Sequence, residues 1–151
     1  MYQSSNNNKN LNNYKQSRWI TGIIVIALLV FGTVRALSGQ SGTVTVQVND
    51  TMLGVLGTYG DPEFIQLSEI NDYQMVETVD YGTCVEGEEK ENTMSGRYSN
   101  AEYGEYTLHV YSDKAPYIVV QYGDEKTIVF NLGSERLTKR TFEDLEEAMN
   151  P

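Results

Sequence analysis

The sequence predicts an α+β domain, mainly of β-strands, preceded by a single N-terminal transmembrane helix. Three observations predict this: an uncharged apolar run near the N-terminus, a series of short segments of alternating apolar residues, and one amphipathic segment at the C-terminus. Strands followed by one helix favour a curled two-sheet antiparallel barrel or sandwich that the helix caps. We expect a disordered Asn-rich tail over residues 1–17, the span over 18–37, a linker over 38–42 and the β domain over 43–151.

The predicted span reads RWITGIIVIALLVFGTVRAL, with sixteen uncharged residues between Arg18 and Arg35. As a helix this run is about 24 Å long, and Arg35 can reach toward the interface on its long stem, so the segment is able to cross a bilayer. A core helix of a soluble domain would have a polar face, and this segment has none. We therefore expect a single-pass membrane anchor.

The flanking charges predict the orientation of this anchor. Lys9, Lys15 and Arg18 precede it, whereas Arg35 is the only basic residue for the next fifty positions. The positive-inside rule then places the N-terminus in the cytoplasm and the β domain outside. A signal peptide cleaved near Ala36-Leu37-Ser38 is the alternative, and it would secrete the domain. Both interpretations export the domain.

The β domain is strongly acidic. All 21 acidic residues lie at or after Asp50 with only seven basic ones, a net charge of −14 for that part of the chain. This charge repels phosphates, so we expect no nucleic-acid partner, and membrane contact only through residues 18–37. Cys84 is the single cysteine and cannot form an internal disulfide, so we expect it to be buried or half-buried and unreactive. An intermolecular disulfide outside the cell is the alternative.

Seven or eight short strands are predicted. Tyr117–Tyr122 is apolar at most positions, which is typical of a central strand covered on both faces. In Glu105–Tyr111 the alternation places His109 on the outward face. The acidic run Glu86–Asn92 is expected to be a solvated loop that binds no metal. The other predicted strands are Thr43–Val48, Met52–Tyr59, Glu63–Leu67, Tyr73–Val79, Thr93–Tyr98 and Thr127–Asn131.

One amphipathic helix is expected at the C-terminus. Thr138 is the predicted N-cap, and Phe142, Leu145 and Met149 form an apolar stripe at helical spacing. The acidic residues between them occupy the solvent side.

From Tyr59 onward the order of several short phrases resembles the bacterial pleckstrin-homology-like domains of small membrane proteins. The resemblance implies a seven-stranded, two-sheet barrel-like sandwich closed by a C-terminal helix, and it implies no catalytic residue. Related folds bind phosphoinositides through a basic loop between the first strands, but Asn49–Thr51 contains no basic residue, so we expect no such binding. The matching phrases are YG, IQLSEI, GRYSN, GEYTLHVY, APYIVVQ, IVFN and LTKRTFEDL.

No motif in the sequence indicates catalysis. His109 is the only histidine, and we expect it at the surface; no nucleophile elbow accompanies it. We expect no catalytic residue, no cofactor and no metal, and a non-enzymatic protein. An enzyme with a carboxylate acid/base pair is a third, less favoured interpretation, because no spacing singles out two of the many acids.

The tyrosines suggest a recognition surface. Nine of the eleven tyrosines lie in the β domain, and strand preference explains most of them. Arg97, Tyr98, Tyr103 and Tyr111 surround one connection, and tyrosine and arginine are enriched at recognition surfaces. The sequence therefore favours an anchored domain for protein interaction or ligand sensing at the extracytoplasmic face, with an unknown protein or peptide partner. The alternative is an exported module that binds cell-wall polysaccharide through surface tyrosines.

Overall fold

A computed structural model describes residues 43–150 of the chain. The predicted tail, span and linker (residues 1–17, 18–37 and 38–42) lie outside the described residues. Among the residues that are described, no helix is long and apolar enough to cross a membrane. The described part is mainly β, with two sheets and one C-terminal helix, as the sequence predicts.

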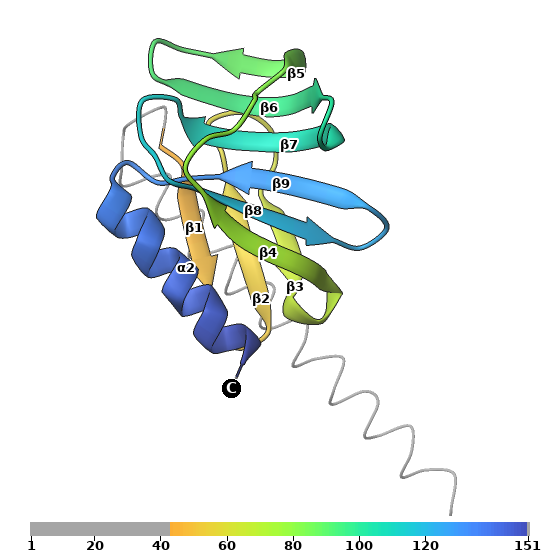
Figure 1. Cartoon of the computed structure of the whole chain (residues 1–151), viewed down its shortest axis with the longest axis vertical. Helices are drawn as coiled ribbons and strands as arrows, with labels where there is room; N and C mark the ends of the chain where they lie inside the picture. The colour runs from red at the N-terminus through yellow and green to blue at the C-terminus, as the bar shows by residue number, and fades with distance from the viewer. Residues whose placement is uncertain (1–42, 151) are drawn as a thin grey trace, which may run out of the picture. The chain divides into compact units, whose positions relative to one another are not determined.

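The first sheet is an antiparallel meander of three strands, in the order β1-β2-β3 (Figure 1). The Asn49-Asp50 turn between β1 and β2 forms because the Asn49 side chain accepts hydrogen bonds from the N–H groups of Thr51 and Met52. The strands are β1 (Thr45–Val48), β2 (Met52–Leu56) and β3 (Glu63–Gln66).

The second sheet has six strands in the order β4-β8-β9-β7-β6-β5. A short 3-10 turn, Leu67–Glu69, leads into it from β3. Its strands are β4 (Ile70–Val76), β5 (Thr83–Glu89), β6 (Thr93–Asn100), β7 (Gly104–Tyr111), β8 (Tyr117–Tyr122) and β9 (Lys126–Phe130).

Two details of the expected sheets are wrong. The described residues form nine strands, where the resemblance implied seven. The pairing is not antiparallel throughout, because β7 and β9 run parallel, with Leu108 opposite Val129. The chain leaves β7, forms β8, and returns through the β8–β9 hairpin, so β9 lies between β8 and β7 with the direction of β7.

The acidic run Glu86–Asn92 is not the predicted loop. Most of it belongs to β5, which pairs with β6 from Thr83 to Glu89. As the last strand of its sheet, β5 presents its acidic side chains to solvent, and charges on an edge strand discourage pairing with other chains. The density of charge in this segment therefore predicted its exposure correctly, but the prediction that the segment forms a loop was wrong.

The second sheet is covered on both faces, and β8 shows this most clearly. Ile118 and Val120 pack with the first sheet and the helix, while Tyr117 and Val119 pack into a second cluster on the opposite face. The prediction of a central strand covered on both sides is confirmed. In Figure 1 the connection between β4 and β5, residues 77–82, crosses in front of this second face.

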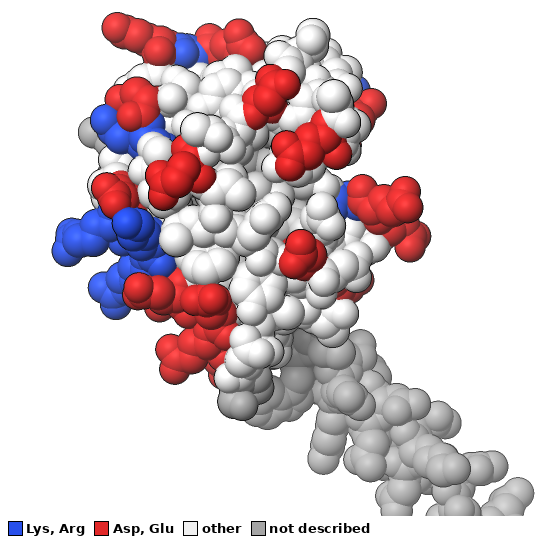
Figure 2. Space-filling model, viewed as in Figure 1, with Lys and Arg blue, Asp and Glu red and all other residues white. Residues whose placement is uncertain are grey.

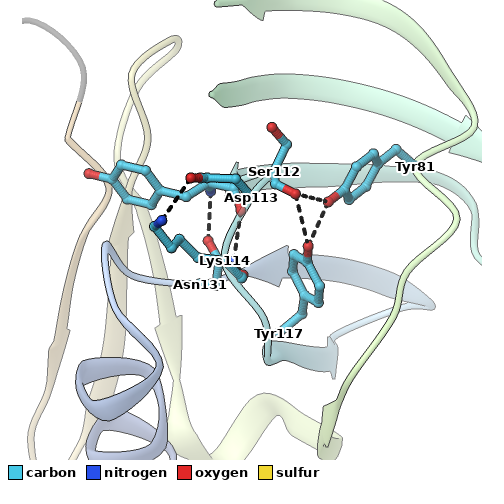
Figure 3. Close-up of polar contacts among 7 residues, drawn as sticks. Tyr81, Ser112, Asp113, Lys114, Tyr117 and Asn131 are labelled. Atoms are coloured by element: carbon cyan, nitrogen blue, oxygen red, sulfur yellow. Dashed lines mark hydrogen bonds and ion pairs between the residues drawn. The ribbon is translucent and has the colours of Figure 1, made fainter. Parts of the chain in front are cut away.

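Tyrosine hydroxyls hold that connection in place (Figure 3). The Tyr81 hydroxyl lies 2.7 Å from the Tyr117 hydroxyl, and both donate to the backbone carbonyl of Ser112 at 3.4 Å. The Tyr106 hydroxyl donates to the Tyr81 carbonyl at 3.0 Å. Burial raises the pKa of Tyr81, and so does its hydrogen bond to Tyr117, so the Tyr81 phenol remains protonated.

Asn131 completes the adjoining corner with a fully buried side chain. Its amide accepts from the Tyr111 N–H at 2.7 Å and donates to the carbonyls of Tyr111 and Lys114 (Figure 3). The side chain thus acts as a strand partner where β9 ends.

The C-terminal helix α2 runs over Glu135–Met149. The predicted stripe is confirmed: Leu145 is fully buried, and Phe142 and Met149 are half-buried against the same core. The predicted N-cap is wrong. Ser134 caps the helix, and Thr138 lies one turn inside it.

Candidate functional site

The first sheet has two edges, β1 and β3, and α2 packs beside only the β1 edge. The helix packs against β1 and β8, and Figure 1 shows β3 at the other edge of the first sheet. Along β3 lies an open groove of about 530 Å³, which we call the seam groove. It is lined by Glu63, Phe64, Ile65, Arg97, Glu105, Tyr106, Thr107, Tyr122, Glu125, Lys126 and Thr127.

Glu63 joins the two walls of the seam groove. Its carboxylate accepts a hydrogen bond from the Thr107 hydroxyl at 2.7 Å and another from the Tyr122 hydroxyl at 2.6 Å. Glu63 is the first residue of β3, while its partners come from β7 and β8 of the other sheet. Burial raises the pKa of Tyr122, with the Glu63 hydrogen bond adding to it, so the phenol stays a donor.

Charges of both signs line the mouth of the groove. Arg97 pairs with Glu86 at 3.1 Å and with Glu105 at 3.0 Å, and all three side chains are more than half exposed. Exposed ion pairs contribute little to stability and exchange easily with other charged groups. Lys126 and Glu125 add a second pair of charges at the β8–β9 turn. The groove can therefore contact cationic, anionic and neutral hydrogen-bonding groups.

Arg97 is the only member of the predicted recognition patch that the structure leaves well exposed. Tyr98 is fully buried, and its hydroxyl donates to the Glu89 carboxylate at 3.0 Å. Tyr103 is half-buried against the Tyr106 ring, with ring centroids 5.4 Å apart. Tyr111 is opposite Thr93, at the far end of the β6–β7 pair from Tyr103. The four residues do not form one surface.

The tyrosines as a group also fail to form an exposed platform. Of the nine in the β domain, only Tyr59 counts as exposed, at 39%. The others supply core packing and buried hydrogen bonds, which is the structural role that strand preference already explained. The positions of the tyrosines therefore do not support a surface on which sugar rings could stack.

His109 is buried, not at the surface as expected. Only 2% of it is exposed, and its Nδ1 lies 2.7 Å from the hydroxyl oxygen of Ser95, which is fully buried. The expectation failed because strict alternation assumed one solvated face, whereas the β2–β3 connection covers β7 on this side. The N–H of Tyr59, in that connection, donates to Ser95 Oγ at 3.0 Å.

This serine–histidine contact resembles a nucleophile and its base, but its surroundings favour a structural role. Both side chains are buried, so a substrate has no route to the hydroxyl. Burial lowers the pKa of His109 to about 4, although the Glu63 carboxylate acts in the opposite direction. The pair fastens the β2–β3 connection to the second sheet. No spacing in the sequence signalled this contact.

No family model, curated protein or solved structure matches the chain. Sequence reasoning selected Arg97 but missed Glu63, Thr107 and Tyr122. A lone glutamate between Pro62 and Phe64 has no motif, and its two hydroxyl partners are distant in sequence.

Cys84 has the environment expected for it. It is free and half-buried in β5, next to the buried Tyr98. Nothing about its position adds to the candidate site.

Proposed function

We propose that the chain is a membrane-anchored, non-enzymatic interaction protein whose exported β domain binds an extended polypeptide in the seam groove. The apolar run over residues 18–37 and the basic residues before it support the anchor and its orientation. The order of phrases from Tyr59 onward, together with two sheets and a C-terminal helix, supports a divergent pleckstrin-homology-like domain. The parallel β7–β9 ladder is a departure from that pattern.

The seam groove is the observation that carries the proposed function. It follows the last strand of a three-stranded sheet, and extended peptides commonly bind beside such a strand. Its walls come from both sheets, and every lining residue except Glu125 lies in a strand. Hydroxyls, carboxylates and two cations along it can fix the direction and register of a peptide.

We do not propose phosphoinositide binding for this domain. The turn Asn49–Thr51 has no basic residue, and the side-chain Oδ1 of Asn49 accepts from the Thr51 hydroxyl as well as from two N–H groups. The polar atoms of the turn are therefore directed inward, toward the turn itself.

Charge reversal at the groove tests the ligand class. Lys126→Glu changes an exposed groove residue, and Lys114→Glu is the control, a half-exposed lysine outside the groove that pairs with Asp113. The full-length protein would be immobilised and offered a library of unstructured peptides and, separately, cell-wall polysaccharide. We expect peptides to be retained, and retention to fall with Lys126→Glu only.

Two outcomes would contradict the proposed ligand class. Equal peptide retention by both variants would exclude the groove as the site. Retention of polysaccharide without any peptide would instead favour the wall-binding alternative.

Protease added to intact cells tests the location independently. Export predicts that the domain after Gly42 is digested while the cells remain sealed, and a cytoplasmic marker protein is the control. Protection of the domain until the cells are lysed would contradict the proposed orientation.

A further inference from the structure

The solvent face of α2 separates its charges by sign. Apart from Glu135, basic residues occupy the first half and acidic residues the second, and Figure 2 shows the two groups next to each other on one side of the molecule. Every residue of this set is exposed, and the set lines one shallow depression along the helix. The members that matter are Arg136, Lys139, Arg140, Glu143, Asp144 and Glu147.

This order is unfavourable for an isolated helix. The N-terminus of a helix carries a partial positive charge and its C-terminus a partial negative one, so acids are favoured at the start and bases at the end. In α2, Arg136 lies in the first turn, Glu147 lies near the end, and no basic residue lies in the last turn. Only Glu135 follows the favourable rule, and it pairs with Lys139 at 2.6 Å.

The charges are self-complementary under reversal of the helix. Reflection through the point between Thr141 and Phe142 exchanges each cation with an acid: Arg136 with Glu147, Lys139 with Asp144, and Arg140 with Glu143. Two identical helices placed antiparallel across a twofold axis undergo this same exchange. Arg136 then faces Glu147 of the second copy and Arg140 faces Glu143, and the reverse holds for the second copy.

The second observation is the helical spacing of these residues. Arg136, Arg140, Glu143 and Glu147 are separated by alternate steps of four and three residues, so they form a single stripe along the helix. Lys139 and Asp144 lie on opposite sides of that stripe. A twofold axis pairs each flank with the same flank of the second copy, so Lys139 lies beside Glu143 of that copy and Asp144 lies beside its Arg140.

We propose that α2 is the contact surface for a second copy of this chain, paired antiparallel about a twofold axis between Thr141 and Phe142. Such an interface uses the same patch on both copies. Exposed ion pairs are individually weak, so the association is modest and salt-sensitive. Attachment of both copies to one membrane, which belongs to the function proposed above, would strengthen it by raising their effective concentration.

Cross-linking without a spacer tests the predicted register directly. Equal amounts of unlabelled and ¹⁵N-labelled full-length protein in detergent micelles would be treated with a carbodiimide, which joins a lysine amine to a contacting carboxylate. We expect a mixed-isotope product that links Lys139 of one copy to Glu143 of the other. Lys139→Arg is the control, since it keeps the charge but removes the reactive amine, and the product should disappear.

Charge-swapped variants test the same contact by repulsion and rescue. Arg136→Glu with Arg140→Glu makes the stripe acidic and keeps Lys139 and Glu143. Glu143→Arg with Glu147→Arg makes the stripe basic and keeps Lys139, which in a mixture can join to Glu143 of the first variant. Each variant alone should lose the mixed-isotope product, and a mixture of the two should regain it. Lys90→Glu with Lys114→Glu applies the same charge change elsewhere on the surface and should leave the product unchanged.

The expected result and the contradicting results differ in the amount of mixed-isotope product. Loss in each variant with recovery in the mixture, and a decrease with added salt, supports the antiparallel pair. Absence of the product in the wild-type protein, equal product in all variants, or no recovery in the mixture overturns it. Neither result depends on the seam groove, so the peptide-binding function is tested separately.

Discussion

The imidazole of His109 is kept neutral by its position inside the domain. Burial favours the uncharged form and lowers the pKa of His109 to about 4, and the Glu63 carboxylate offsets only part of this effect. The neutral ring fits its contact at 2.7 Å with the Ser95 hydroxyl, which can act as donor or acceptor. The domain therefore contains one group that acid must force into a charged state.

Acid should consequently destabilise the domain through His109. The folded-state pKa of about 4 lies below the ordinary value of 6.5, so the unfolded chain binds more protons between these limits. The free energy of unfolding is then highest above pH 6.5 and falls as the pH decreases toward 4, by about 3 kcal/mol in total. Urea unfolding from pH 4 to pH 8 measures this.

The variant His109→Gln separates this effect from protonation of the many carboxylates. The free energy of unfolding of the wild type minus that of the variant should increase from pH 4 to pH 6.5 and stay constant above pH 6.5. Parallel curves would show that His109 does not carry the dependence.

Gly57 lies against the same buried pair. A Cβ at this position would overlap with His109 Nδ1 and with Ser95 Oγ, so only glycine fits there. Gly57→Ala should lower the free energy of unfolding by about 1–3 kcal/mol. Gly133→Ala is the control, because its added Cβ would meet only the Tyr111 ring at 3.7 Å or more, an ordinary contact, and its effect should stay within about 0.5 kcal/mol. A similar loss in both variants would contradict the crowding at Gly57.

At the scale of the elements, the start of α2 depends on two hydroxyls with different tasks. Ser134 caps the helix with a long bond of 3.4 Å from the Leu137 N–H. Thr138 Oγ1, which is buried, accepts from the Leu132 N–H at 3.0 Å and donates to the Ser134 carbonyl at 3.2 Å. Thr138 therefore joins the helix to the end of the sheet.

Substitution of the buried Thr138 should lower the free energy of unfolding more than substitution of the less buried Ser134. Thr138→Val keeps the shape but leaves the Leu132 N–H without its acceptor, which costs about 1–3 kcal/mol. Ser134→Ala should cost at most about 1 kcal/mol, since the long bond is near the surface. Thermal unfolding followed by circular dichroism measures both, and Thr141→Val in the same helix is the control. A larger loss for Ser134→Ala would contradict this assignment.

At the scale of the whole molecule, the net charge of −14 over residues 50–151 opposes folding by self-repulsion. Acids are spread over the visible face in Figure 2, with few cations among them. Because the charges are exposed, salt should screen them effectively at about 0.15 M, where the screening length is about 8 Å.

We therefore expect the Tm to rise between a low-salt buffer and one containing about 0.15 M sodium chloride. Choline chloride at equal ionic strength should give the same rise, because screening does not depend on the identity of the cation. A Tm that falls or stays constant would show that the ion pairs of Arg97 and Lys139 outweigh the repulsion.

The sequence predicted more of the fold than of the candidate site. Periodicity predicted most strands, the two-sided burial of β8 and the apolar stripe of α2, since each depends on residues close together in the chain. It failed for β5, where charge hid a strand, and for the outward placement of His109.

What the sequence alone determined is local in origin: a mainly β domain, one terminal amphipathic helix, the separation of charge along the chain and a half-buried Cys84. The tertiary structure decided which faces of the strands meet. It turned β9 parallel to β7, covered His109 with the β2–β3 connection, buried Tyr98 and brought Glu63 to Thr107 and Tyr122. These contacts join residues 44 and 59 positions apart, and no local periodicity encodes which distant segments will pack together.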